Sequence, residues 1–393
     1  MKKAQSISIL LALALTAALF FAGCALFGGG GAGKRSAEPD DRDTSWYDPK
    51  SKETTFSISS EKQLEGLVKL TRAAKNAEDF SGKTIVLAGD IDLDGINWTP
   101  IGTFRGTFDG KGYSISNLSV SGADIAGLFG QVEMGQIKNL VVNVQKIETK
   151  KGSATSAGGL VGYGLNITIE NCGVNIADSI TAYSEKLPRD TEGHTAYAGG
   201  LVGWIDGPMT TSTINNSYVV GNVSAVSGAN GANASGGLVG NIGLAMFKVT
   251  LNINNSYFAG SVSSSTADSN TFCGGILGCG GIFEAAVKNS YANATVNTAI
   301  ADTKGGRSQP YFGGIFGRWA GGTNTSVYYN STKVTSQKIN SGVRDGAMPE
   351  GITALADADM KRQASFAGFD FSNVWAIEAS YNGGYPYLRW QKK

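Results

Sequence analysis

The sequence predicts an all-β protein that folds as a right-handed parallel β-helix, on three observations. The first is a four-residue phrase, two glycines flanking two apolar residues, which occurs six times and begins at Gly127, Gly159, Gly200, Gly237, Gly275 and Gly314. The second is the spacing of successive copies, 32, 41, 37, 38 and 39 residues, which is typical of stacked units with loops of variable length. The third is an Asn that recurs after the first five copies, at Asn139, Asn171, Asn216, Asn255 and Asn289.

Each copy predicts a unit of three short strands joined by turns. The two residues between the glycines are never polar, which is typical of a buried strand, and the glycines suit close backbone approaches that a Cβ would forbid. One unit cannot bury its apolar side chains alone, so we expect like strands of successive copies to pair in parallel, along a right-handed path. The recurrent Asn side chains would then form a ladder, and Tyr218, Tyr257 and Tyr291 would stack.

The first 23 residues resemble a bacterial lipoprotein signal peptide. Lys2 and Lys3 precede an apolar run that ends in Ala22-Gly23-Cys24. The resemblance implies cleavage before Cys24, lipidation of Cys24 and anchoring to a membrane. Ala25 after the cysteine would permit sorting to the outer membrane and surface exposure. An ordinary secretory signal or an uncleaved anchor is the alternative. Residues 24–55 contain four consecutive glycines and mixed charges, which predicts a flexible tether.

Residues 56–393 are predicted to form a single domain, with the repeats over 127–345 and a C-terminal cap over 346–393. Ser60 and Gln63 have the spacing of a capping box, so we expect a short helix from Glu61 to Asn76. That helix would cover the strand edges of the first unit. The C-terminal residues are rich in aromatic side chains, which indicates a cap on the last unit, because the terminal units of a solenoid must be atypical.

Several phrases together resemble the GLUG-repeat proteins, bacterial surface proteins whose repeats also occur beside IgA-protease domains. Besides the repeated phrase, they are Asp90-Ile-Asp-Leu93, Trp98-Thr-Pro-Ile-Gly102, Phe108-Asp-Gly-Lys-Gly-Tyr113 and Asn382-Gly-Gly-Tyr-Pro-Tyr-Leu-Arg-Trp390. The resemblance covers roughly residues 56–390. It implies a right-handed β-helix, surface exposure and often an adhesive role, and it brings no agreed catalytic residues. A single histidine cannot form a His-Glu-x-x-His zinc site, so we expect no protease domain.

The composition argues against nucleic acid as a partner. Thirty-three basic residues face 32 acidic ones without a basic cluster, whereas binding to a phosphate backbone needs clustered Lys and Arg. We expect no cofactor and no metal, although Asp90, Asp92 and Asp94 match the opening of a calcium loop that would lack its bidentate Glu. Cys172 replaces the Ser of other copies, and Cys273 and Cys279 are too far apart along one strand to form a disulfide.

The candidate binding residues follow the second glycine of the repeated phrase, where the residue type becomes variable. Tyr163, Trp204 and Arg318 occupy this position, and Trp319 comes next. Aromatic side chains on a rigid ladder suit contacts with sugar faces or partner side chains. Coverage of the same positions by loops is the alternative.

A binding protein is the predicted function, and catalysis is not expected. His194 is predicted to lie in a solvated loop, and the candidate acids, Asp206, Glu284, Asp190 and Glu192, do not recur in one column as paired carboxylates would. We therefore expect a lipid-anchored, monomeric, cell-surface adhesin for a glycan or protein of a host or neighbouring cell. A polysaccharide-degrading enzyme and a purely structural envelope protein remain as alternatives.

Overall fold

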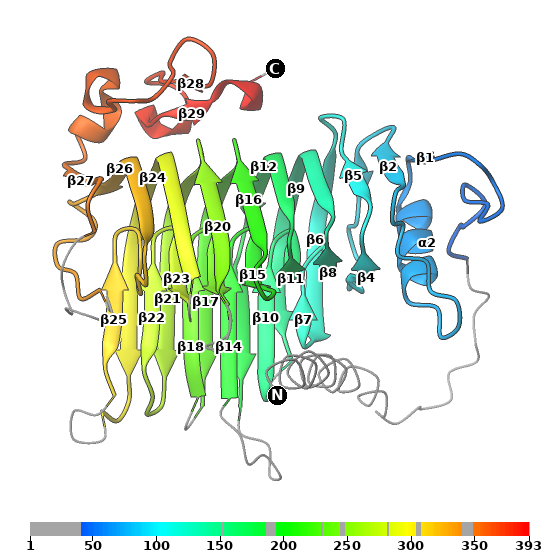
Figure 1. Ribbon diagram of the computed structural model, residues 1–393, viewed down its shortest axis with the longest axis horizontal. Coiled ribbons are helices and arrows are strands. Elements are labelled where there is room, and N and C mark those ends of the chain that lie inside the picture. Colours follow the sequence, from blue (N-terminus) through cyan, green and yellow to red (C-terminus); the bar gives the residue numbers. More distant parts are fainter. Residues whose placement is uncertain are drawn as a thin grey trace, which may run out of the picture. The chain divides into compact units, whose positions relative to one another are not determined.

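The computed structural model describes residues 41–150, 152–185, 194–228, 231–243, 248–280, 283–303, 308–339 and 349–392 (Figure 1). The chain from Arg42 onward forms one compact unit. The predicted signal peptide, Cys24 and the tether up to residue 40 lie outside the described residues. Among the residues described, no helix is long and apolar enough to cross a bilayer.

Three parallel sheets build the stack, and consecutive repeats supply neighbouring strands of each. Sheet A contains β1 (Thr55–Ile58), β2 (Thr84–Leu87), β3 (Ile91–Asp92), β5 (Thr107–Asp109), β6 (Ser114–Ala123), β9 (Gln136–Thr149), β12 (Thr168–Ile176), β13 (Ile180–Ser184), β16 (Thr211–Asn215), β17 (Tyr218–Ser227), β20 (Val249–Asn254), β21 (Tyr257–Thr266), β24 (Phe283–Ile300), β26 (Gly322–Asn330) and β27 (Ile352–Leu355). Sheet B contains β4 (Ile101–Phe104), β8 (Phe129–Glu133), β11 (Val161–Leu165), β15 (Val202–Asp206), β19 (Val239–Ile242) and β23 (Leu277–Gly280). Sheet C contains β7 (Ile125–Ala126), β10 (Ala154–Gly158), β14 (His194–Gly199), β18 (Gly231–Gly236), β22 (Thr271–Gly274) and β25 (Pro310–Gly313).

The repeated phrase forms the corner at which the chain passes from sheet C to sheet B. Its first apolar residue is at most 1% exposed in all six copies, at Leu128, Leu160, Leu201, Leu238, Ile276 and Ile315. The glycines are required by the closeness of neighbouring backbones: a Cβ on Gly200 would lie 2.3 Å from the carbonyl oxygen of Gly237. The fourth residue of the phrase meets sheet C, since a Cβ on Gly240 would lie 2.7 Å from the backbone of Ala198. The predicted structural role of the glycines is confirmed.

In-register stacking produces the predicted side-chain ladders. Asn171 Nδ2 donates to Asn139 Oδ1 over 3.1 Å, and the rings of Tyr257 and Tyr291 stack with centroids 5.0 Å apart and planes 1° apart. Each Asn of the column has a positive φ of 47–52°, a turn conformation that Asn tolerates better than most residues. Cys172 lies in the Ser column, and its backbone N–H donates to Ser217 Oγ.

The predicted fold class, an open right-handed parallel β-helix, is wrong in the pairing of sheet A. Strand β9 pairs with both β12 and β13, and β17 pairs with the same two strands, so these four parallel strands form a closed circuit. The circuit arises because β9 and β17 continue through the corner at which β12 and β13 are interrupted. The sequence predicted separate strands at this corner.

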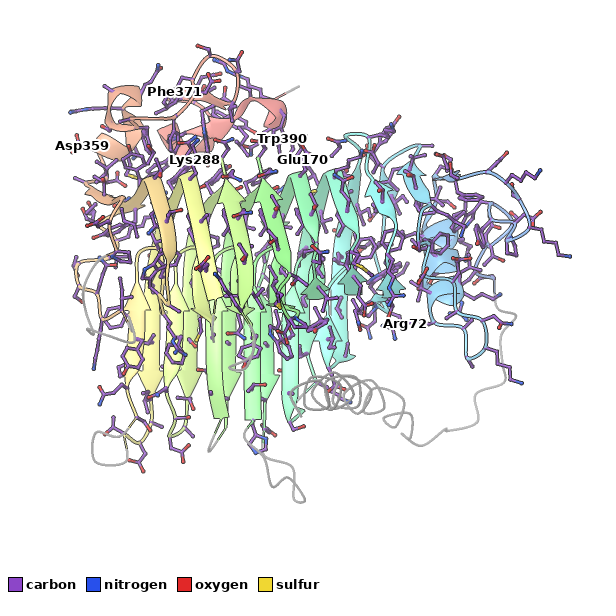
Figure 2. The ribbon with its side chains drawn as sticks, in the orientation of Figure 1. Arg72, Glu170, Lys288, Asp359, Phe371 and Trp390 are labelled. Atoms are coloured by element: carbon purple, nitrogen blue, oxygen red, sulfur yellow. The ribbon has the colours of Figure 1, made fainter. Side chains whose placement is uncertain are left out.

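The N-terminal end of the stack is covered as predicted by a helix, α2 (Glu61–Thr71), the one α-helix among the described residues. Ser60 caps it by accepting from the Gln63 backbone N–H. At its other end Arg72 Nε donates to the carbonyl oxygen of Pro100, just before β4 (Figure 2). Tyr47 is only 8% exposed and packs in the same core, so residues 42–55, expected to belong to the tether, are part of the compact unit.

The predicted C-terminal cap is wrongly placed. Residues 349–392 lie along the side of the stack, over the strands of sheet A, and carry the short antiparallel pair β28 (Trp375–Ala376) and β29 (Tyr387–Leu388) (Figure 1). Single 3-10 turns precede β28 at Asp359–Lys361 and Gln363–Ser365, separate the two strands at Asn382–Gly384, and follow β29 at Arg389–Gln391. Their aromatic residues pack on the tyrosine column, formed by Tyr218, Tyr257, Tyr291 and Tyr328.

A different segment covers the last strand of sheet C. The backbone N–H of Phe312 donates to the carbonyl oxygen of Lys338, and the reverse bond is also made, both over 2.9 Å. The Gln337 side chain accepts from the backbone N–H of Gly314 over 2.8 Å. Val334 and Ile339 are buried against this end. Residues 331–339 therefore satisfy the edge of β25 that an unprotected stack would expose.

We predict that Leu238→Asp prevents stable folding. Leu238 is fully buried at the corner, and an unpaired carboxylate there costs several kcal/mol or forces its own neutralisation. Thermal unfolding followed by circular dichroism measures the effect. Met209→Asp is the control, since Met209 is 89% exposed, and equal melting temperatures for the two variants would contradict the assignment of the core.

We predict that Trp375→Ala loosens residues 349–392 while the sheets stay folded. The fully buried Trp375 ring lies 4.6 Å from Phe369 and 5.9 Å from Tyr291, and removing it leaves a cavity that costs roughly 3–5 kcal/mol. Hydrogen exchange measured by mass spectrometry should accelerate in 349–392 only. Equal acceleration in sheet B would show that residues 349–392 unfold together with the stack, which would contradict the prediction.

Candidate functional site

Two of the predicted binding residues meet at the contact between sheets B and C. Tyr163 in β11 and Trp204 in β15 are in-register neighbours, with ring centroids 5.1 Å apart at 80°. Tyr197 in β14 also contacts the indole, with ring centroids 5.5 Å apart at 62°. We call these three residues the aromatic junction; each is partly exposed. The sequence did not single out Tyr197, because nothing local shows which residue of sheet C faces Trp204.

Arg318 and Trp319 do not join the aromatic junction. Asn241 and Cys279 separate Arg318 from Trp204 along the column, so Arg318 lies three strands away, roughly 14 Å at the usual strand spacing. The Trp319 ring packs on Phe316, at a centroid distance of 4.5 Å. The predicted four-residue surface is therefore divided into two places.

The middle of the column that runs from Trp204 to Arg318 is covered. Asn241 is 4% exposed, and Cys279 is 8% exposed in a small cluster with Ala234, Phe272 and Tyr311. Burial raises the pKa of the Cys279 thiol to about 11, although the guanidinium of Arg318 acts in the opposite direction. A neutral buried thiol is a poor nucleophile. The column was expected either to form an exposed surface or to be covered by loops. Its central residues, Asn241 and Cys279, are covered, and its end residues, Trp204 and Arg318, are partly exposed.

The prediction for His194 is wrong. His194 is the first residue of β14 and is 1% exposed, so it lies inside the structure and not in a solvated loop. Its backbone is in register with Gly231 of the next strand. The apolar pattern of sheet C was too short before the third repeated phrase to show that the strand extends back to this residue.

The candidate acids fall in different places. Asp206 is 9% exposed and lies two residues after Trp204 in the same strand. Glu284 forms an ion pair with Lys248 over 2.7 Å, with both side chains about half exposed. Asp190 and Glu192 lie outside the described residues. Glu133, which the sequence did not single out, is 4% exposed and forms an ion pair with Arg105.

The aspartates of the possible calcium loop bond within the protein. Asp90 Oδ1 accepts from the backbone N–H and the hydroxyl of Ser114, and Asp92 Oδ1 accepts from Asn117 Nδ2 over 2.7 Å. These bonds join neighbouring strands of sheet A. Within the described ranges, no group of three or more His, Cys, Asp or Glu side chains is placed to hold a metal ion.

Comparisons with known proteins show a shared fold and do not assign a family. No family model matches the chain, the GLUG repeat included. A crystal structure described as a "putative immunoglobulin A1 protease" from Bacteroides ovatus is similar over 86% of this chain and 92% of that chain, at 18% identity and a TM-score of 0.55. A second structure, described as IgA1 protease, covers 76% of this chain and 21% of that chain, at 16% identity and a TM-score of 0.40.

One curated relative shares sequence with part of the chain. Halomucin of Haloquadratum walsbyi is 32% identical over 169 residues, which is 40% of this chain and 2% of halomucin. The sequence predicted that the chain is not an enzyme. That prediction is withdrawn, because the chain shares its fold with the Bacteroides ovatus chain described as a protease. These likenesses fit a surface-associated protein that shares its fold with the Bacteroides ovatus chain, and they assign no specific function.

Proposed function

We propose that the chain is a cell-surface binding protein of the GLUG-repeat kind, anchored to the outer membrane by lipid at Cys24. It acts as an adhesin, and as a monomer, toward a glycan or protein of a host or neighbouring cell. The near balance of 33 basic and 32 acidic residues supports a partner other than nucleic acid. The lipid rests on the residues before Cys24, and mass spectrometry of the mature N-terminus tests it.

The aromatic junction is the observation that supports the proposal. Trp204 contacts the rings of Tyr163 and Tyr197, which belong to two different sheets, and these contacts restrict its position before any ligand arrives. Partly exposed aromatic rings in fixed positions bind sugar faces and protein side chains at low entropic cost. Arg318 and Trp319 provide a second contact region further along the stack, which suits an extended ligand.

Asp206 supports a second candidate, a polysaccharide-degrading enzyme. Its carboxylate belongs to the same strand as Trp204, two residues along, and sugar hydrolysis needs carboxylates beside a bound ring. Glu133 lies in the same column two strands away, with Leu165 between them. Arg105 holds Glu133 in an ion pair, so a paired acid and base are not free as the structure stands.

We predict that Trp204→Ala weakens binding at least tenfold, because buried aromatic anchors contribute 2 kcal/mol or more at binding sites. The measurement is a glycan array and a matrix-protein panel with the full chain, followed by titration of each hit. Trp204→Phe should retain most of the affinity. Tyr113→Ala is the control, since Tyr113 is 38% exposed in the connection between β5 and β6 and is not part of the aromatic junction.

The same substrates are tested for turnover by reducing-sugar and unsaturated-product assays. Product formation that Asp206→Asn abolishes would replace the binding proposal with the enzyme. Unchanged affinity in Trp204→Ala, with an unchanged melting temperature, would remove the junction from the binding site.

A further inference from the structure

A hollow of about 270 Å³ opens on sheet A and shares no residue with the aromatic junction. Its polar lining is made of carboxamides, and its apolar lining includes Ile176 and Val220; the carboxamides belong to Asn117, Asn143, Gln145 and Asn175. None of its lining residues carries a charge. The hollow therefore offers hydrogen bonds and apolar contact without a counter-ion.

The hollow lies where sheet A bends. Strand β12 ends at Ile176, one residue after Asn175, and β13 starts at Ile180 after a turn. On the next strand the bend falls at Gly221, whose φ of +134° suits glycine, and a Cβ there would lie 2.5 Å from the Cβ of Ile176. The bend is thus fixed by the backbone, and the hollow is part of the folded structure.

The carboxamides of the lining hold one another in place. Asn143 Nδ2 donates to Ser116 Oγ over 3.1 Å, and Asn175 Nδ2 donates to Asn143 Oδ1 over 2.9 Å. Each carboxamide has two N–H groups and two lone pairs; the ladder bonds and the bond of Asn175 to the side chain of Tyr218 use some of these groups and leave others. The ladder therefore fixes the orientation of the amides and leaves them further donors and acceptors.

The far end of the same column shows what such amides bind. Pairing carries the column from Asn143 and Asn175 to Asn293, through Val220 and Ala259. Asn330 continues it by donating to Asn293 Oδ1 over 3.0 Å. There the C-terminal segment covers the column, and Asn330 Nδ2 donates to Asp357 Oδ1 over 2.8 Å. At this end the acceptor is a carboxylate that has its own counter-ion, Lys361, over 2.9 Å, while the other end of the column is open.

The C-terminal segment stops beside the hollow. Trp390, labelled in Figure 2, lies 5.6 Å from the ring of Tyr218, and its indole N–H donates to the carbonyl oxygen of Asn216. Tyr218 lies two residues before Val220 in β17, so both side chains are on the same face. Val220 is 36% exposed, which is high for an aliphatic side chain in this sheet.

We propose that this hollow binds a neutral saccharide unit. Oriented carboxamides match the paired donors and acceptors of sugar hydroxyls, and Val220 with Ile176 matches the C–H faces of the ring. The lack of charge in the lining argues against a phosphate, a carboxylate sugar or a metal ion. The site is separate from the aromatic junction and does not depend on the proposed function.

The test is saturation-transfer NMR and titration of the full chain with methyl glycosides of glucose, galactose, mannose and N-acetylglucosamine. Methyl glucuronide, sialic acid and an extended Gly-Ser peptide are the comparison ligands. Val220→Arg should abolish binding of a neutral glycoside by filling the hollow. Asn175→Ala should weaken it about tenfold through a lost hydrogen bond.

Matched variants separate the site from general stability. Met209→Arg adds the same charge at a position that is 89% exposed, and Asn254→Ala removes an equivalent ladder amide, whose Nδ2 donates to Asn215 Oδ1 over 2.9 Å. Both should bind normally. If Asn175→Ala fails to fold, Val220→Arg still decides, because Val220 is exposed enough to accept a long side chain.

The outcomes are distinct. Binding of a neutral glycoside that Val220→Arg abolishes and Trp204→Ala leaves unchanged supports the site. Failure of every neutral glycoside to bind, binding of the charged sugars or the peptide alone, or binding that survives Val220→Arg overturns it. Binding lost in Trp204→Ala and kept in Val220→Arg also overturns it, and assigns the sugar to the aromatic junction.

Discussion

In-register parallel pairing of successive repeats is the constraint on which the other features depend. It brings backbones so close at the corner between sheets C and B that Gly200 and Gly237 have no room for a Cβ. It also places each side chain over its counterpart about 4.8 Å away, so a favourable pair is repeated along the stack. The Asn ladder, the Ser-to-backbone bonds and the stacked tyrosines all follow from this one geometric rule.

The same constraint explains why some residues could be predicted from the sequence. A column is visible as a recurrent residue, so the Asn ladder, the Tyr stack and the buried corner could be expected from spacing alone. The circuit in sheet A could not, because it depends on β9 continuing through a bend at which β12 and β13 are interrupted, and no Gly or Pro marks that bend in β9. His194 was missed because the apolar pattern before the third repeated phrase is too short, and Tyr197 because nothing local shows which residue of sheet C contacts Trp204.

The C-terminal segment shows a second limit of sequence patterns. Its aromatic residues correctly indicated that the segment covers apolar surface, but the expected position, the last unit, was wrong. Aromatic composition does not specify which surface is covered. Trp390 binds the backbone of Asn216, 174 residues earlier in the chain, and such a contact leaves no local signal. The tyrosine column determined the position: Tyr257 and Tyr291 needed an apolar cover along the side, and the edge of β25 was already covered by residues 331–339.

A stacked architecture separates binding surfaces from the core in a particular way. Changing one repeat alters one step of a column and leaves its neighbours paired. The column that is tyrosine at Tyr218 is Gly173 one strand earlier and Val141 in the strand before that. A shift from large to small residues along a column produces a hollow or an edge without breaking the stack. The open amides at Asn143 and Asn175, and the covered ones at Asn293 and Asn330, are the two results of one column. A functional site in such a protein is therefore best sought where the residue type of a column changes, because the positions that keep one residue type stabilise the stack.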